Sequence, residues 1–204
     1  SRDLFLLEYT GGKLHIPTIT TEKSVKLIRE AKKKGLNVTC SVAVHNLVLT
    51  DDELHGFDGN KKVNPPLRTS KDIKALLKGL KDGTIDIITS DHNPIDIEHK
   101  KVEFSTAKDG TIGLERAFGA LNSVLDIKTN VNCLSNNPKE RFGIEKISIQ
   151  ENQKADLSIF SPDGDYTFSE ENIISTSKNS IFLNKDLKGK VYGIYNNSQL
   201  ILNS

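Results

Sequence analysis

Two residues of the types that bind divalent metals occur in similar positions, each shortly after a short apolar run. His45 follows the run 37–42, and Asp91 follows the run 85–89. Imidazole nitrogen and carboxylate oxygen are both good ligands for zinc. Their spacing alone is a weak signal, because a structural zinc site needs about four protein ligands and a catalytic site about three. Hydrogen bonding by His45 and turn capping by Asp91 within Asp-His-Asn-Pro stay open as alternatives.

A stiffened loop carries a third candidate, Asn64, at the start of the run Asn-Pro-Pro-Leu-Arg. The residue before a proline is held extended, and Arg68 at the end of the run could pair with a carboxylate. Contact with a ligand and simple anchoring of the loop are both compatible with this chemistry. The sequence contains no glycine loop suited to phosphate and no nucleophile elbow.

Short apolar runs and amphipathic helices alternate between residue 13 and about residue 126. Strands are predicted over 14–19, 37–42 and 85–89, and helices over 22–34, 70–82 and 112–125. Thr20 or Thr21 is a plausible N-cap of the first helix. This order is typical of a parallel α/β sheet or barrel, in which the chemistry lies at the carboxyl ends of the strands. That rule adds His15, Thr18 and His92 to the candidates. Three or four strands are too few to close an eight-stranded barrel.

The alternation of apolar runs and amphipathic helices does not continue after about residue 144. Short β-like stretches separated by Asn, Asp, Gly and Ser turns predict a few strands of a small antiparallel sheet. These stretches cover 147–149, 155–160, 166–168 and 190–195. Asn136-Asn137-Pro138 is predicted to start a helix.

The overall charge excludes some classes of partner. The chain has 28 Lys and Arg against 27 Asp and Glu, so no net field argues for nucleic acid or an acidic membrane surface. No apolar run approaches the roughly 20 residues that span a bilayer. Cys40 and Cys133 lack CxxC spacing and follow no secretory segment, which predicts reduced thiols and a cytoplasmic location. The first residues read as the end of a helix, so we expect further sequence upstream of Ser1.

Taken in order, the motifs of the chain resemble those of the dihydroorotases. Asn-Pro-Pro-Leu-Arg and Asp-His-x-Pro are specific to that group, and the resemblance covers essentially the whole chain. It is carried by Leu14-His15-Ile16, His45-Asn46-Leu47, Val63-Asn64-Pro65-Pro66-Leu67-Arg68, Ser90-Asp91-His92-Asn93-Pro94, Ile112-Gly113-Leu114-Glu115, Lys154-Ala155-Asp156-Leu157, Lys178-Asn179-Ser180 and Lys188-Gly189-Lys190-Val191.

This resemblance implies a zinc-dependent (β/α)8 barrel with a small β-sandwich, of which the chain holds only the C-terminal portion. Residues 1–146 would then form the C-terminal part of the barrel, and residues 147–204 a partial sandwich. The implied reaction interconverts carbamoyl aspartate and dihydroorotate in pyrimidine biosynthesis, with an aspartate that shuttles the proton. His45 and Asp91 resemble metal ligands, Asp91 also resembles the catalytic aspartate, and Asn64 resembles a substrate-binding asparagine.

The chain departs from the family pattern at several positions. Val44-His45-Asn46-Leu47 replaces Pro-His-His-Leu but keeps the ligand, Lys108-Asp109-Gly110 replaces a Pro-Phe-Gly stretch near the substrate, and two further departures remove side chains that bind metal or substrate. In His15-Ile16-Pro17-Thr18, Thr18 stands where the family has a second histidine that binds metal, and a hydroxyl is a poor substitute for imidazole on zinc. Ile95 stands where the family has a histidine that grips the substrate carboxylate. Loss of that charge-assisted partner would cost on the order of 2–3 kcal/mol of binding. The family's His-x-His pair is expected upstream of Ser1.

Three hypotheses follow from this pattern of retained and lost residues. The first is a dihydroorotase, with His45 and Asp91 as ligands in the full-length protein. The second is a non-catalytic homologue that scaffolds or regulates aspartate carbamoyltransferase, which Thr18 favours. The third is a hydrolase of another cyclic amide, which Ile95 favours. For the chain by itself we expect no bound zinc and no turnover. Pairing with another copy, or with a separate N-terminal part, would cover its open sheet edges.

Overall fold

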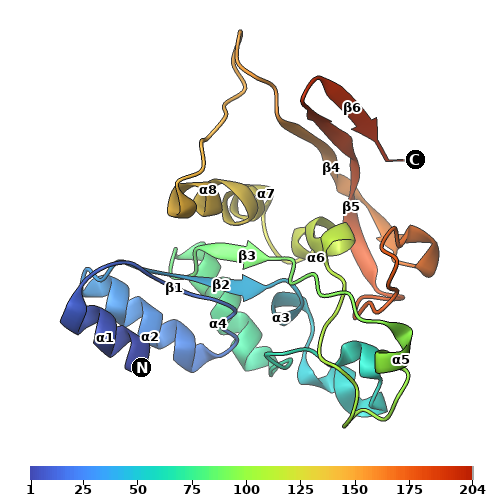
Figure 1. The fold of residues 1–204 in the computed structure, drawn as a ribbon, viewed down its shortest axis with the longest axis horizontal. Coiled ribbons are helices and arrows are strands. Elements are labelled where there is room, and N and C mark those ends of the chain that lie inside the picture. Colours follow the sequence, from blue (N-terminus) through green and yellow to red (C-terminus); the bar gives the residue numbers. More distant parts are fainter. Residues whose placement is uncertain (204) are drawn as a thin grey trace.

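A parallel sheet of three strands forms the centre of the computed structural model, which describes residues 1–203 (Figure 1). The order of the strands in the sheet is the same as their order in the sequence. Both pairs of neighbours are parallel, as the alternation of strands and helices predicts. The strands are β1 (Leu14–Ile16), β2 (Val38–Ala43) and β3 (Ile87–Thr89).

Strand β1 is shorter than the predicted range 14–19. It ends before Pro17, which has no N–H to donate to a neighbouring strand. The next residue, Thr18, has a positive φ of 47°, which turns the backbone out of the extended conformation. Strand β3 likewise begins later than predicted, at Ile87.

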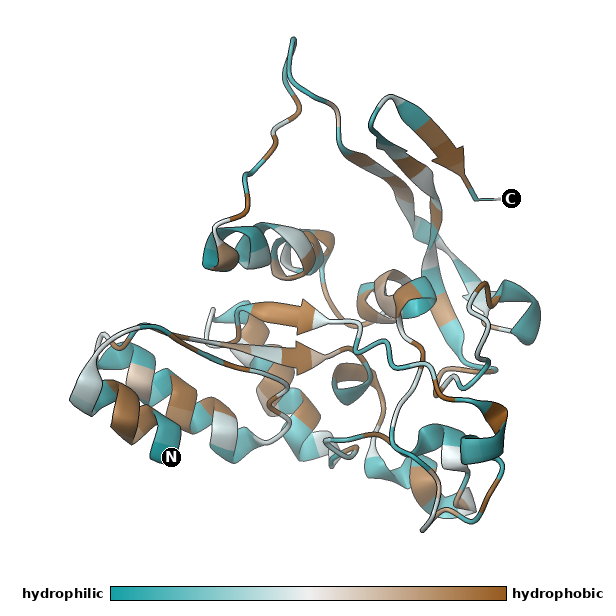
Figure 2. Ribbon diagram, viewed as in Figure 1, coloured by the Kyte–Doolittle hydropathy of each residue, from teal (hydrophilic) through white to brown (hydrophobic). Residues whose placement is uncertain are grey.

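Two amphipathic helices pack side by side against one face of this sheet (Figure 1). Helix α2 (Glu22–Lys33) begins after Thr21, whose hydroxyl accepts a hydrogen bond from the Ser24 N–H, so Thr21 is the cap. Helix α4 (Ser70–Lys81) begins after Thr69, which caps it in the same way. Their buried faces carry the apolar residues at helical spacing, and charged residues occupy the opposite faces (Figure 2).

Short helical turns connect these elements and frame the sheet. Helix α1 (Arg2–Thr10) precedes β1 and confirms the helix predicted at the start of the chain. The segment after β2 forms α3 (His45–Val48) and the 3-10 turns η1 (Asp51–Gly56) and η2 (Gly59–Lys61). A further short helix, α5 (Ile97–Lys100), lies in the segment after β3.

The helix predicted over 112–125 starts later than expected. Thr111 forms a bridge to His92, and the Ile112 N–H donates to the Asn179 carbonyl, so this stretch is extended. Helical structure begins with η3 (Leu114–Arg116) and continues as α6 (Ala117–Asn122). The prediction that 136–138 starts a helix is confirmed, because α8 (Asn137–Phe142) begins at Asn137 with Pro138 in its first turn, although it directly continues a preceding helical run. That preceding run comprises α7 (Ile127–Val131) and the π-turn η4 (Asn132–Asn136).

The C-terminal part forms a separate antiparallel sheet of three strands, as predicted in kind. Two of the predicted stretches merge into one long bulged strand, and 147–149 is not a strand. The last strand had no counterpart in the prediction. The elements are β4 (Leu157–Thr167), the turn η5 (Glu170–Asn172), β5 (Asp186–Asn196) and β6 (Gln199–Leu202).

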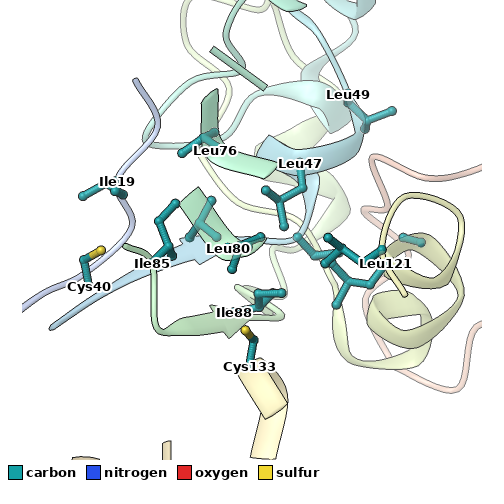
Figure 3. Close-up of a cluster of buried hydrophobic side chains, with 14 of the residues drawn as sticks. Ile19, Cys40, Leu47, Leu49, Leu76, Leu80, Ile85, Ile88, Leu121 and Cys133 are labelled. Atoms are coloured by element: carbon teal, nitrogen blue, oxygen red, sulfur yellow. The ribbon is translucent and has the colours of Figure 1, made fainter. Parts of the chain in front are cut away.

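One continuous apolar core joins the two sheets. It surrounds the central sheet, where Leu47, Leu76 and Ile88 pack from different elements (Figure 3), and it extends to Phe168 and Phe182 of the C-terminal part. The domain boundary at residue 146 therefore stays a prediction. Both cysteines are buried and free. Within residues 1–203 no helix combines the length and apolarity needed to cross a bilayer.

Candidate active site

His45 and Asp91 lie together at the carboxyl end of the central sheet. Each residue follows its strand by two positions, and β2 and β3 are parallel neighbours, so both side chains emerge at the same edge. The Val44 N–H donates to the Thr89 carbonyl at 3.0 Å, which extends the pairing up to the two residues. His45 Nε2 then lies 3.8 Å from Asp91 Oδ2.

The His45 imidazole is completely buried, and this burial defines its chemistry. Neither ring nitrogen has a hydrogen-bond partner among residues 1–203, although buried polar atoms are normally satisfied. Desolvation lowers the pKa of His45 to about 4. The ring is therefore neutral at pH 7 and keeps a lone pair available. A neutral imidazole without a protein partner is suited to a ligand that the protein itself does not supply.

Asp91 is partly exposed and sits on a strained backbone. Its φ of 48° is in the left-handed region, which non-glycine residues seldom adopt outside functional sites and turns. Partial burial raises the pKa of its carboxyl group. The 3.8 Å between Asp91 Oδ2 and His45 Nε2 is too long for a hydrogen bond. The imidazole therefore lies near the carboxylate without being hydrogen-bonded to it.

Thr18 occupies the corresponding place after β1, on the same edge of the sheet. Like Asp91 it has a positive φ directly after a strand, here 47°, although a β-branched side chain makes this conformation costly. Its N–H donates to the Ser41 hydroxyl of β2 at 3.1 Å, which fixes the turn. The three strand ends thus carry Thr18, His45 and Asp91 in sheet order.

Asn64 lies on a loop that contacts α3 through Asn46, and it lines a hollow that includes neither His45 nor Asp91. The Asn46 side chain donates to the Pro66 carbonyl at 3.4 Å and holds the loop against α3. Asn64 lines a hollow of about 350 Å³ together with Lys62, Phe104 and other residues of the neighbouring loops. Among the hydrogen bonds of residues 1–203, none joins Asn64 to His45 or Asp91.

Arg68, predicted as a possible partner for a carboxylate, instead donates from Nε to the Thr20 hydroxyl at 3.2 Å. This bond ties the end of the Asn-Pro-Pro-Leu-Arg run to the segment that follows β1. The anchoring interpretation of this loop end is therefore the one that the geometry favours, because both partners belong to connecting segments.

Ile95 lines a larger hollow of about 750 Å³, and its backbone is fixed by a residue that sequence reasoning missed. Asn179 accepts a hydrogen bond from the Ile95 N–H at 3.1 Å. The same side chain donates to the carbonyls of Asn93 and Gly110. Asn179 thereby pins the loop that follows Asp91. Its only sequence signal was the run Lys-Asn-Ser in the resemblance, which carries no spacing information about this loop.

The two other histidines near the strands have structural partners. His92 Nδ1 accepts hydrogen bonds from the backbone N–H groups of Gly113 and Leu114. His15 Nδ1 lies 2.9 Å from the Thr39 hydroxyl, and its ring packs edge-on against Phe142. Burial, followed by the nearby Arg141, lowers the pKa of His15. Neither ring pairs with Asp91.

The donor set at this edge fits part of a metal site. The 3.8 Å between His45 Nε2 and Asp91 Oδ2 is close to the separation of two ligands on one tetrahedral zinc ion, about 3.4 Å for bonds of ~2.1 Å. The unpartnered imidazole satisfies the same interpretation. Within residues 1–203, however, no group of three or more His, Cys, Asp and Glu side chains is placed to hold a metal. The chain offers two donors of a larger set.

Comparison with known proteins gives a consistent result. The model of the amidohydrolase family matches residues 10–191. A dihydroorotase from Caldicellulosiruptor saccharolyticus is 42% identical over 98% of this chain. The solved L-hydantoinase (dihydropyrimidinase) from Arthrobacter aurescens superposes over 98% of the chain with a TM-score of 0.90 and 25% identity.

A third similar protein is the inactive dihydroorotase-like domain of a CAD-like multifunctional protein from Chaetomium thermophilum. It superposes over 97% of this chain with a TM-score of 0.73 and 26% identity. The chain spans about half the length of the proteins it matches, with 48% of the dihydroorotase, 47% of the hydantoinase and 53% of the inactive domain covered. The central sheet of three strands is accordingly a part of their barrel fold.

Proposed function

The chain belongs to the amidohydrolase family, and from this premise we propose that it supplies the C-terminal part of a dihydroorotase. The proposed reaction of the whole protein is the reversible hydrolysis of dihydroorotate to carbamoyl aspartate in pyrimidine biosynthesis. The observation that carries the proposal is the buried His45 ring, which has no protein partner and faces Asp91 across 3.8 Å. A purely structural histidine in the core would have its nitrogens satisfied.

Members of this family are generally metal-dependent. We assign His45 and Asp91 as two of the ligands, with the remaining ligands contributed from outside this chain. A zinc ion held there would supply Lewis-acid polarisation of the substrate carbonyl. Thr18 is not assigned as a ligand, because a hydroxyl is a poor donor to zinc compared with imidazole.

Asp91 is the proposed carrier of the proton. Burial raises the pKa of Asp91. At neutral pH its ionised and protonated forms are therefore closer in free energy than those of a solvated carboxylate, which suits a group that accepts a proton and returns it. The positive φ of 48° at Asp91 is a strained backbone conformation of the kind that clusters at active sites. The loop that follows Asp91 is fixed by hydrogen bonds between Asn179 and the backbone of Asn93 and Ile95.

Asn64 is the proposed substrate-binding residue. Its amide offers both a donor and an acceptor, which matches the alternating N–H and C=O groups of a cyclic amide. The hollow that it lines also contains Lys62, whose ammonium lies 5.6 Å from the centre of the Phe104 ring. A cation of this kind offers an attractive contact to an anionic substrate.

Zinc analysis and turnover of the full-length protein test the proposal. We expect one or more zinc ions per chain, loss of metal and of dihydroorotate hydrolysis in His45→Asn, and no change in the control His99→Asn, whose side chain is exposed. Full activity of His45→Asn would exclude the ligand role. For residues 1–204 alone we expect no stoichiometric zinc, because two donors are fewer than the roughly three that a catalytic zinc site needs. Stoichiometric zinc bound by His45 and Asp91 in that fragment would contradict this expectation.

A non-catalytic homologue that scaffolds aspartate carbamoyltransferase is the second candidate. Thr18 favours it, because it places no strong metal ligand at the end of β1. The inactive domain from Chaetomium thermophilum is a similar protein in which catalysis is absent. The double variant Thr18→His, Ile95→His separates the two candidates. An inactive parent with an active double variant supports the decayed enzyme, and substantial parent activity excludes it.

The same assays should include hydantoin as substrate. Ile95, in the loop after Asp91, presents an apolar side chain to the hollow that it lines. An uncharged cyclic amide is therefore the favoured substrate class if the protein does not turn over dihydroorotate. Hydantoin hydrolysis without dihydroorotate hydrolysis would establish this third alternative.

A further inference from the structure

Helices α2 and α4 form a cationic groove on the outer surface of the molecule. The α2–α4 groove is a hollow of about 330 Å³ between the two helices, remote from the strand ends that carry His45 and Asp91. Five of its eight lining residues are lysine or arginine. The lining residues are Glu22, Val25, Lys26, Arg29, Lys71, Lys74, Ala75 and Lys78.

The groove concentrates charge that the chain as a whole does not have. The two helices carry nine lysines and arginines against three carboxylates, whereas the whole chain is balanced at a net charge of +1. Ordinary solvated helix faces usually intersperse the two signs. The excess on this face is therefore a local feature and not a consequence of composition.

Internal ion pairs neutralise only part of this charge. Glu22 is shared between Lys71 at 2.9 Å and Lys26 at 3.4 Å, and these lysines lower its pKa. Arg29 pairs with Asp82 at 2.8 Å. Lys74 and Lys78 have no ion pair among the residues that the structure describes, and both are exposed. Their ammonium groups are available to an external anion.

The bottom of the groove is apolar. Val25 is buried beneath the cationic walls, and Ala75 is half-buried with a side chain too small to fill the space between the helices. A ligand with negative charge at its edges and a small apolar group at its centre is complementary to these walls and this floor. Glutamate and leucine on one face of a peptide have this arrangement.

We propose that the α2–α4 groove binds an acidic amphipathic segment of a partner protein. Apolar side chains of that segment pack on Ala75, and its carboxylates pair with Lys74 and Lys78. The interaction is independent of the proposed enzymatic function, because both helices lie outside the candidate active site. It holds equally for a catalytic and a non-catalytic protein.

The chemistry of the groove favours a peptide over a nucleic acid. Single-stranded nucleic acids are bound by aromatic platforms on which bases stack, and neither α2 nor α4 contains an aromatic residue. The apolar floor has no counterpart in a phosphate backbone. Lysine is also less suited than arginine to bidentate phosphate recognition, and the single arginine of the groove is already paired.

Fluorescence anisotropy with a short labelled peptide of glutamate and leucine at helical spacing tests the proposal on the full-length protein. We expect saturable binding at low ionic strength that weakens as salt is added, because exposed charges are screened. Reversal of two charges in Lys74→Glu, Lys78→Glu should weaken binding roughly tenfold or more. The matched control Lys13→Glu, Lys128→Glu has the same change in net charge at exposed positions elsewhere and should bind as the wild type does.

Further measurements control for misfolding of the variants and for the contribution of the peptide's charge. Thermal unfolding followed by circular dichroism shows whether the variants fold, and Lys74→Gln, Lys78→Gln provides a milder change with the same expected direction. The same peptide with glutamine in place of glutamate should bind much more weakly. Equal binding of the two peptides, equal loss in the control variant, or tighter binding of single-stranded DNA than of the acidic peptide would overturn the proposal.

Discussion

The two sheets of the molecule differ in how completely they are covered. In the central sheet, five of the six residues of β2 are buried, because helices pack against the sheet and parallel neighbours flank the strand. In the C-terminal sheet, every residue of β6 is exposed, although Leu200, Ile201 and Leu202 are apolar. Figure 2 shows this apolar strand at the outer edge of the sheet.

This difference in burial distinguishes the central sheet, which positions His45 and Asp91, from the C-terminal sheet, which packs against the central region. Strands buried on both sides have their register fixed by packing, which is what places His45 opposite Asp91 within the central sheet. The C-terminal sheet touches the core mainly at one end, through Phe168, Phe182 and Leu187. Its remaining apolar surface contributes little to the stability of this chain.

The contact between the two regions includes a buried ion pair, whose loss should have the largest effect. Glu115 pairs with Arg116 and accepts hydrogen bonds from the N–H groups of Ile174 and Ser175, and Arg116 stacks on Phe168 with no side-chain exposure. Glu115→Ala leaves that guanidinium buried without its carboxylate, so we expect a loss of about 3–5 kcal/mol. Urea denaturation measures it, with the exposed Glu151→Ala as control. A loss as small as in the control would show that the regions are not joined through this pair.

Truncation of one leucine in each region compares their packing directly. Leu47 has no exposed surface and Leu200 is 55% exposed. We expect Leu47→Ala to lower the free energy of unfolding by about 2–5 kcal/mol through lost burial and a cavity, and Leu200→Ala by about 0.5 kcal/mol or less. Chemical denaturation of both variants tests the contrast. Similar losses would mean that β6 is buried in the folded protein in solution.

A glycine substitution tests how tightly the candidate site is packed. A Cβ on Gly113 would overlap the Ser90 carbonyl, one residue before Asp91, whereas a Cβ on Gly56 would meet open space. We expect Gly113→Ala to cost about 1–3 kcal/mol through the forced backbone shift and Gly56→Ala to be nearly neutral. Melting temperatures report the stability, and the NMR shifts of Asp91 report the displacement. An unshifted Asp91 would show that the loop absorbs the change elsewhere.

The smallest effect should be a pH dependence arising from Lys100. Its buried ammonium donates to the carbonyls of Gly59 and Lys62, and desolvation lowers its pKa to about 8 from an ordinary 10.5. Between these values Lys100 binds more protons in the unfolded chain than in the folded chain, so its contribution to the free energy of unfolding rises with pH. Burial raises the pKa of Cys40 to about 12 and that of Cys133 to about 11, so these thiols contribute in the opposite direction in the same window.

The free energy of unfolding of the wild type minus that of Lys100→Met should therefore rise with pH across the window, and the same difference for the exposed Lys190→Met should stay flat. Unfolding curves across the window measure this difference, and a difference between the wild type and Lys100→Met that does not change with pH contradicts the lowered pKa.

Local sequence determined the elements of the central region. Thr21 and Thr69 precede apolar residues at helical spacing, and both cap helices as such residues do. His45 and Asp91 were recognisable because they follow apolar runs, and the parallel order of those runs placed them on one edge. At Ile112 the helix prediction failed because a longer-range contact overrode the local pattern, since its N–H donates to the Asn179 carbonyl instead of joining a helical turn.

What only the tertiary structure decided is the environment of each candidate. The burial of His45 without a partner depends on every element packed around it, and no neighbour in sequence specifies it. The anchoring of the Ile95 loop depends on Asn179, which lies 84 residues further along the chain. Residue types and their order can be read from local spacing, whereas desolvation and distant hydrogen bonds arise only when separate segments are brought together.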